Sequence, residues 1–132
     1  MKKEKVIRAI LIDPFARKVS EIKLVNELEE IYKTLGCDLI TITGLRFGGK
    51  QLDLILDDEG LLKDRENQRY FKYKLFSQPF AGKGLLVGSD KEGNCASIPD
   101  DVYSEQVDRD IIWFNPSDDE LDATLEWKVL PI

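Results

Sequence analysis

Residues 26–43, with the sequence NELEEIYKTLGCDLITIT, contain both kinds of regular structure that this chain is expected to form. Apolar side chains first recur at the spacing of an amphipathic α-helix, at positions Leu28, Ile31, Tyr32 and Leu35. Gly36 then predicts the end of the helix, because glycine adopts the left-handed conformation found after many helices. After Gly36 the apolar period changes to two, which predicts a strand over residues 38–43. A helix followed directly by a strand indicates a mixed fold.

The helix is expected to span about residues 26–36. Asn26 is a suitable N-cap, and Glu29 stands three residues later, where it completes a capping box. The opposite face carries Glu27, Glu30 and Lys33, so we expect it to face water.

Working outward, most other patterned segments have the period of a β-strand. Residues 6–12 (VIRAILI) are apolar at nearly every position, which is typical of a strand covered on both faces. Further strands are expected over residues 18–24, 51–57, 70–76, 83–88, 94–98, 110–114 and 123–129. A short second helix is expected near residues 100–107, because proline and acidic residues favour a first helical turn. The sequence therefore predicts an α+β fold over residues 1–132, a single domain with one mostly antiparallel sheet and one principal amphipathic helix.

The composition excludes several kinds of chemistry. The chain has no histidine, so an imidazole base, a Ser-His triad and a His-ligated zinc are all excluded. No apolar run approaches the roughly 20 residues that span a bilayer, so we expect no membrane segment. Cys37 and Cys95 do not make a disulfide framework, and we interpret them as free thiols in a reducing, cytoplasmic setting. We expect no cofactor and no metal.

Negative charge is concentrated near the C-terminus. Residues 99–132 hold 2 basic and 10 acidic residues, although the whole chain carries a net charge of only −6. Such a region repels phosphate, so we expect no direct binding of nucleic acid. The region is interpreted either as a solvated face or as a surface that binds a basic partner. In the second case the interaction surface would include Asp118, Asp119, Glu120 and Asp122.

Three patterns resemble catalytic or nucleotide-binding motifs without meeting their requirements. Residues 44–51 (GLRFGGKQ) nearly match a P-loop, but a strand is predicted where a helix must follow. Residues 82–88 contain glycines that precede a strand, whereas a dinucleotide fingerprint opens a helix. Asp100, Glu126 and Lys128 match the loose carboxylate-lysine pattern of metal-dependent nucleases, which arises easily by chance in an acidic chain. No catalytic residue is therefore assigned.

Four segments resemble a known family of small proteins. They are residues 12–14, 31–38, 57–62 and 78–88, the last of which reads QPFAGKGLLVG. Over residues 6–98 the chain resembles the domain of unknown function 3846 family, small proteins encoded by bacteriophages and prophage-bearing bacteria. The resemblance implies an origin in a phage or mobile element and an intracellular setting, but it implies no reaction, cofactor or catalytic residue. Residues 99–132 are then an acidic extension.

Two functions remain open from the sequence. The first is a non-enzymatic accessory protein that binds a host or defence protein, as its acidic region and its resemblance indicate. The alternative is a protein that binds a small polar, nucleotide-like ligand. Its pocket would lie near Asp57, Asp58, Gln78 and Lys83, which offer carboxylates, an amide and an ammonium group. A metal-dependent nuclease is the weakest of the alternatives.

Overall fold

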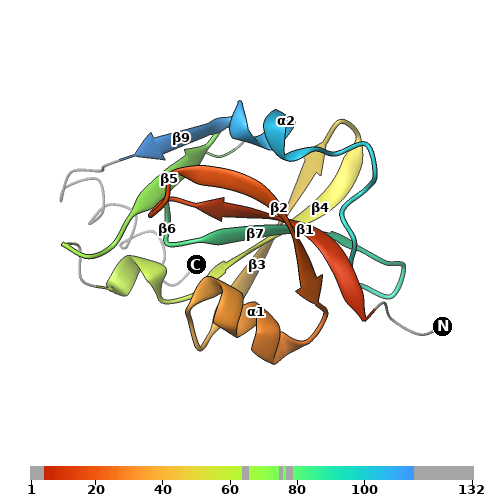
Figure 1. The fold of residues 1–132 in the computed structure, drawn as a ribbon, viewed down its shortest axis with the longest axis horizontal. Coiled ribbons are helices and arrows are strands. Elements are labelled where there is room, and N and C mark those ends of the chain that lie inside the picture. The colour runs from red at the N-terminus through yellow and green to blue at the C-terminus, as the bar shows by residue number, and fades with distance from the viewer. Residues whose placement is uncertain (1–4, 64–65, 75, 77–78, 115–132) are drawn as a thin grey trace, which may run out of the picture.

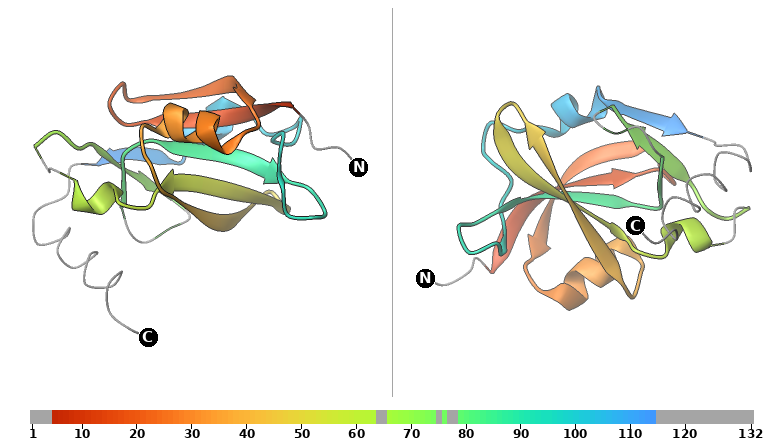
Figure 2. Two further views of the ribbon diagram at one scale, coloured as in Figure 1. Left: turned by 90° about the horizontal axis from the view of Figure 1, so that it is seen from below. Right: turned by 180° about the vertical axis from the view of Figure 1, so that it is seen from behind.

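The computed structural model describes residues 5–63, 66–74, 76 and 79–114. Most described strands form one antiparallel sheet with the order β2-β1-β7-β4-β3, and β8 also pairs with β7. The strands of this main sheet are β1 (Val6–Asp13), β2 (Lys18–Val25), β3 (Ile40–Phe47), β4 (Lys50–Asp57), β7 (Gly84–Ser89) and β8 (Cys95–Ala96). The left view of Figure 2 shows the sheet from β2 at one edge to β3 at the other. The expectation of a mostly antiparallel fold is confirmed.

A second, smaller sheet was not anticipated, so the prediction of one sheet is wrong. It has the order β6-β5-β9, and its strands are β6 (Phe80–Ala81), β5 (Tyr70–Tyr73) and β9 (Ile111–Phe114). Alternation along a strand reports which side chains are buried, but it does not report which sheet the strand joins. The small sheet packs on the main sheet through the fully buried side chains of Phe71 and Tyr73.

The main sheet is covered on both faces. Helix α1 (Leu28–Leu35) covers one face, and the small sheet covers the other together with helix α2 (Ser104–Asp108). Figure 1 shows these layers, with α1 below the strands of the main sheet and α2 and β9 above them. Along β1, Ile7 and Ala9 face α1, whereas Ile10 and Ile12 face the small sheet. This confirms that residues 6–12 form a strand buried on both sides.

Helix α1 ends as predicted but begins differently. Gly36 caps its C-terminus with a φ of 68°, in the left-handed region. The N-cap is Glu27, without a capping hydrogen bond from its side chain, so the predicted capping box of Asn26 is wrong. Asn26 is instead buried, and its amide donates a hydrogen bond of 2.9 Å to the carbonyl oxygen of Cys95. Leu28 is 53% exposed, so the apolar stripe is shorter than expected.

The glycine-rich segment after β3 forms a hairpin and not a P-loop. Strand β3 continues to Phe47, and Gly48 and Gly49 make the turn with φ values of 56° and 82°. Strand β4 follows at once, so no helix is present to bind phosphate. The expected end of the strand at residue 43 is therefore too early, because Gly44 lies within β3 opposite Asp53.

The second helix begins later than the sequence predicted. Pro99 opens a turn, in which the N–H of Val102 donates to the Pro99 carbonyl at 3.0 Å. Helix α2 then starts at Ser104, where the side chain of Gln106 accepts a hydrogen bond from the backbone N–H of Tyr103 at 2.8 Å. The expected helix over 100–107 is thus replaced by a turn and a five-residue helix.

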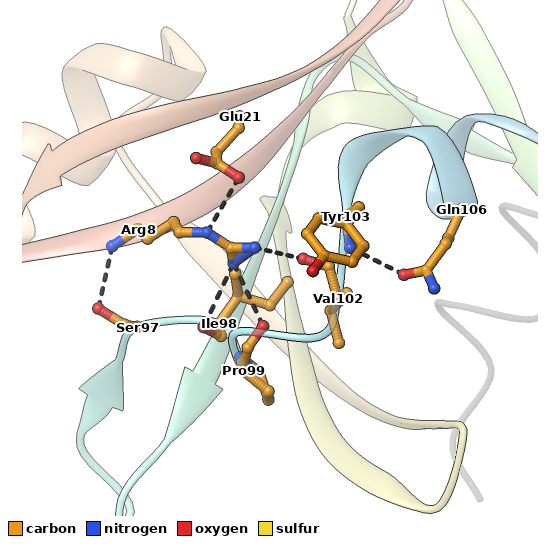
Figure 3. A network of polar contacts seen from close by, with 8 residues as sticks. All are labelled: Arg8, Glu21, Ser97, Ile98, Pro99, Val102, Tyr103 and Gln106. Atoms are coloured by element: carbon orange, nitrogen blue, oxygen red, sulfur yellow. Dashed lines mark hydrogen bonds and ion pairs between the residues drawn. The ribbon is translucent and has the colours of Figure 1, made fainter.

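The chain between β8 and α2 is held to the main sheet by Arg8 (Figure 3). Its guanidinium group donates hydrogen bonds to the carbonyl oxygens of Ile98, Pro99 and Val102. The same group pairs with the carboxylate of Glu21 on β2 at 2.9 Å. One side chain from β1 therefore fixes the position of the segment that leads to α2.

Cys37, which is buried, and Cys95, which is half-buried, do not form a disulfide. None of the helices in the described part of the chain is both long enough and apolar enough to cross a membrane. The predicted strand at 123–129 lies outside the described residues, as do Asp118, Asp119, Glu120 and Asp122.

Candidate functional site

A polar cavity lies at one end of the main sheet. There β1 and β4 end and β7 begins, because Ile12 and Leu56 both pair with Gly84. The cavity has a volume of about 240 Å³. Its wall is formed by Phe15, Leu35, Gly36, Asp57, Lys63, Asn67, Gln68, Gly82 and Lys83. The β1–β2 turn, the end of α1 and the loops around β4 and β7 thus contribute to one hollow, which we call the end cavity.

Asp57 is the buried charged group of the end cavity. It is the last residue of β4, and its side chain is only 7% exposed. One carboxylate oxygen accepts the backbone N–H of Glu59 at 2.9 Å, and the other pairs with the Lys63 ammonium at 2.6 Å. The hydrogen bond with Asp57 raises the pKa of Lys63 above its ordinary value. Lys63 itself is 47% exposed, so the pair joins a buried anion to a cation at the surface.

Gln68 shapes the loop that closes the cavity on one side. Its buried amide donates a hydrogen bond of 2.9 Å to the carbonyl oxygen of Gly60. Gly82 has a φ of 80° and donates its N–H to the carbonyl oxygen of Arg69 at 2.8 Å. Both glycines lie where a side chain is disfavoured, since a Cβ on Gly60 would lie 2.7 Å from the Ala81 carbonyl oxygen. The wall near Gln68 is therefore set by backbone contacts.

A wider and more open hollow of about 540 Å³ adjoins the end cavity. The two share Phe15, Leu35, Gly36 and Lys83 in their walls. Phe15 is 51% exposed, so its ring offers apolar surface to a bound molecule. Asp13 also lines the wider hollow, and its carboxylate accepts the backbone N–H groups of Phe15 and Ala16 at 2.9 and 3.3 Å. The combined space is large enough for a small organic ligand.

The charges of the cavity wall are not equally available. The carboxylates of Asp13 and Asp57 already accept hydrogen bonds or an ion pair within the chain. Lys83 is half-buried, and within the described part of the chain its ammonium group has no ion pair and no hydrogen bond. The uncommitted charge facing the space is therefore positive, and the arrangement favours an anionic group near Lys83.

Cys37 lies behind the cavity rather than in its wall. Burial raises the pKa of its thiol, and the nearby Asp57 carboxylate raises it further. A protonated, buried thiol is a poor nucleophile. Cys37 therefore belongs to the apolar core under α1, together with Leu35 and Ile55.

The residues predicted from the sequence are only partly brought together. Asp57 and Lys83 line the same cavity. Asp58 is exposed and lies outside its wall, and its backbone N–H donates to the carbonyl oxygen of Leu39. Gln78 lies outside the described residues. Phe15, Lys63 and Gln68 are not among the predicted site residues, although the polar run over residues 63–69 that holds the last two is typical of a binding loop.

The described residues contain no cluster of three or more carboxylate or thiol groups that would hold a metal ion. Of the nuclease pattern, Asp100 is exposed after Pro99, whereas Glu126 and Lys128 lie outside the described residues. The described part of the chain thus contains a polar cavity and no cluster of this kind.

Comparison with known families gives one match. Residues 7–109 match the family described as domain of unknown function (DUF3846). Because the match covers most of the chain, the protein belongs to this family. The matched region extends past the expected limit at residue 98 and includes α2. No curated protein and no solved structure matched the chain.

Proposed function

We propose that this protein binds a small anionic ligand of the nucleotide class in the end cavity. The observation that carries the proposal is the half-buried Lys83, which has no partner among the described residues although it lines both hollows. An ammonium group without a counterion in the chain is a favourable partner for an anion, because hydrogen bonds between charged groups are stronger than those between neutral groups. The carboxylates of Asp13 and Asp57 do not act as counterions of Lys83. Asp13 accepts the backbone N–H of Phe15, and Asp57 pairs with Lys63.

The rest of the wall suits a ligand with a planar portion. The exposed ring of Phe15 offers a stacking surface beside Lys83. Asn67 and Gln68 also line the cavity and make its wall polar, and Gly36 and Gly82 leave room where a side chain would otherwise project. A base or similar ring on Phe15 with a phosphate near Lys83 uses each of these features.

Binding is tested by thermal shift and calorimetry with nucleoside mono- and diphosphates, inorganic phosphate and the uncharged nucleosides. A ligand present at a hundred times its dissociation constant stabilises the folded state by about 2.7 kcal/mol, which is readily detected. We expect stabilisation by at least one nucleotide and none by its nucleoside. Absence of any shift across the panel would refute the proposal.

The variant Lys83→Gln provides the first specific prediction. Loss of a charge-assisted hydrogen bond is expected to weaken binding of the nucleotide by about tenfold to a hundredfold. Lys91→Gln is the matched control, because it removes the same charge from an exposed turn between β7 and β8. Equal affinities for the Lys83→Gln and Lys91→Gln proteins would show that binding occurs elsewhere.

A second candidate function rests on the acidic composition of residues 99–132. In this proposal a phage-encoded accessory protein binds a basic host or defence protein through Asp118, Asp119, Glu120 and Asp122. Affinity capture from a bacterial lysate tests it, with a charge-matched acidic protein as control. Recovery of the same proteins on both baits would remove the support for this function.

A further inference from the structure

The two edges of the main sheet differ in how they are protected. At one edge, β2 exposes Lys18, Glu21 and Lys23, which are typical of edge strands that avoid pairing. At the other edge, β3 has no charged residue from Ile40 to Leu45, and Ile42 at its centre is 52% exposed. Among the described strands none pairs with the outer side of β3. An uncharged, extended edge of this kind is a template for pairing with another strand.

The direction of the backbone groups on β3 follows from a single contact. The carbonyl oxygen of Leu39 accepts the N–H of Asp58 at 3.0 Å, so Leu39 points its backbone groups toward β4. Backbone groups of successive residues in a strand point alternately to the two sides. Ile40, Ile42 and Gly44 therefore direct their N–H and C=O groups away from β4, toward the side on which no described strand pairs with β3.

We propose that a second copy of this chain pairs with β3 in antiparallel orientation, about a two-fold axis through Ile42. This register places Ile42 opposite Ile42 of the second copy, so two half-exposed apolar side chains bury one another. It also joins the two main sheets into one continuous sheet, with both α1 helices on the same face. A two-fold arrangement of this kind closes on itself and does not lead to fibres.

Charge complementarity is the argument that selects a second copy as the occupant. Arg46 lies within β3, four residues after Ile42, and Asp38 lies at a bend two residues before β3 and four residues before Ile42; both are exposed. A two-fold axis through Ile42 therefore brings Arg46 of each copy next to Asp38 of the other. Opposite charges on facing positions stabilise a pair of strands, and like charges destabilise it. The same axis sets Thr41 opposite Thr43, a favourable cross-strand pair.

Sedimentation velocity and light scattering of the full chain, from low micromolar to near-millimolar concentration, test the proposal. We expect a concentration-dependent dimer, which is lost in Ile42→Lys because two lysines then face one another at the axis. Ile112→Lys is the matched control, since Ile112 is similarly exposed (57%) but lies on β9, and it should leave the dimer unchanged. A monomer at every concentration, or a dimer that survives Ile42→Lys, would overturn the proposal.

The register is tested by charge reversal. Asp38→Arg alone sets arginine against Arg46 and should raise the dissociation constant of the dimer about tenfold or more. Combining Asp38→Arg with Arg46→Asp exchanges the charges and should restore the wild-type affinity. Circular dichroism of each variant reports whether the fold is retained. Failure of the double variant to recover the dimer, with the fold intact, would exclude this pairing.

Discussion

At the scale of single residues, Asp57 determines the character of the end cavity. It is buried at the end of β4, and it is stabilised there by Lys63 and by the backbone N–H of Glu59. Because Asp57 pairs with Lys63, it compensates the positive charge of that lysine, whereas the charge of Lys83 has no such counterion among the described residues. Asp57 thus determines which of the two lysines in the cavity wall is paired, namely Lys63 and not Lys83.

Lys63 provides a prediction about pH. Its raised pKa means that, while Asp57 is ionised, the ion pair contributes its full stability below the ordinary lysine pKa, and this stability is lost as pH rises through the raised value. Replacement of Asp57 by Asn should return the pKa of Lys63 toward its ordinary value. Titration of the lysine side chains by NMR measures both values, with Lys91 as an exposed reference. A pKa for Lys63 that is the same in wild type and Asp57→Asn would contradict the assignment.

At the scale of elements, the strands of the main sheet approach neighbouring chain segments too closely for a side chain at certain glycines. A Cβ on Gly88 of β7 would lie 2.4 Å from the carbonyl oxygen of Ser97. A Cβ on Gly44 of β3 would lie 2.8 Å from the amide nitrogen of Gln51, which is the end of a flexible side chain. Of these two contacts, only the one at Gly88 involves rigid backbone.

We therefore expect different effects of the same substitution at these two glycines. Gly88→Ala should destabilise the fold by about 2 to 3 kcal/mol, since the segment around Ser97 must move. Gly44→Ala should change stability by less than about 1 kcal/mol, because Gln51 is free to take another rotamer. Urea denaturation of both variants measures the difference. If Gly88→Ala were no more destabilising than Gly44→Ala, the segment around Ser97 would be less tightly packed against Gly88 than the structure shows.

At the scale of the whole molecule, Arg8 joins two parts of the chain that are 94 residues apart in sequence. It connects β1 with the segment before α2, and this segment covers the face of the main sheet that also carries the small sheet (Figure 3). Three carbonyl oxygens depend on one guanidinium group, and they have lost part of their contact with water. Lysine cannot replace this group, because it lacks the planar fork of donors.

Arg8→Gln is predicted to destabilise the protein by about 2 to 4 kcal/mol, through loss of charged hydrogen bonds and exposure of unpaired carbonyl groups. Amide hydrogen exchange should increase most at Ile98 and in α2, and least in α1. Glu21→Gln breaks only the surface ion pair of Arg8 and should cost less than about 1 kcal/mol. A uniform rise in exchange over the whole chain would argue against a local role for Arg8.

Much of the local structure follows from short-range patterns in the sequence. The end of α1 at Gly36, the burial of β1 on both faces and the hairpin at Gly48 and Gly49 each depend on neighbouring residues. Such features are predictable because helix and strand periods and the conformational freedom of glycine act over a few positions. Asp57 and Lys83 were also chosen from the sequence, as polar groups beside strands, and they line the same cavity.

Only the tertiary structure decided the remaining features, since they join residues that are distant along the chain. The capping role expected of Asn26 gave way to a contact with Cys95, 69 residues away, and Arg8 reaches Val102, 94 residues away. The division into two sheets likewise depends on which strands meet. Periodicity records which side chains avoid water, but it carries no information about the partner that covers them. Packing of the complete chain decides which element covers each apolar face. The same packing places Lys63 beside Asp57 and leaves Lys83 facing the cavity.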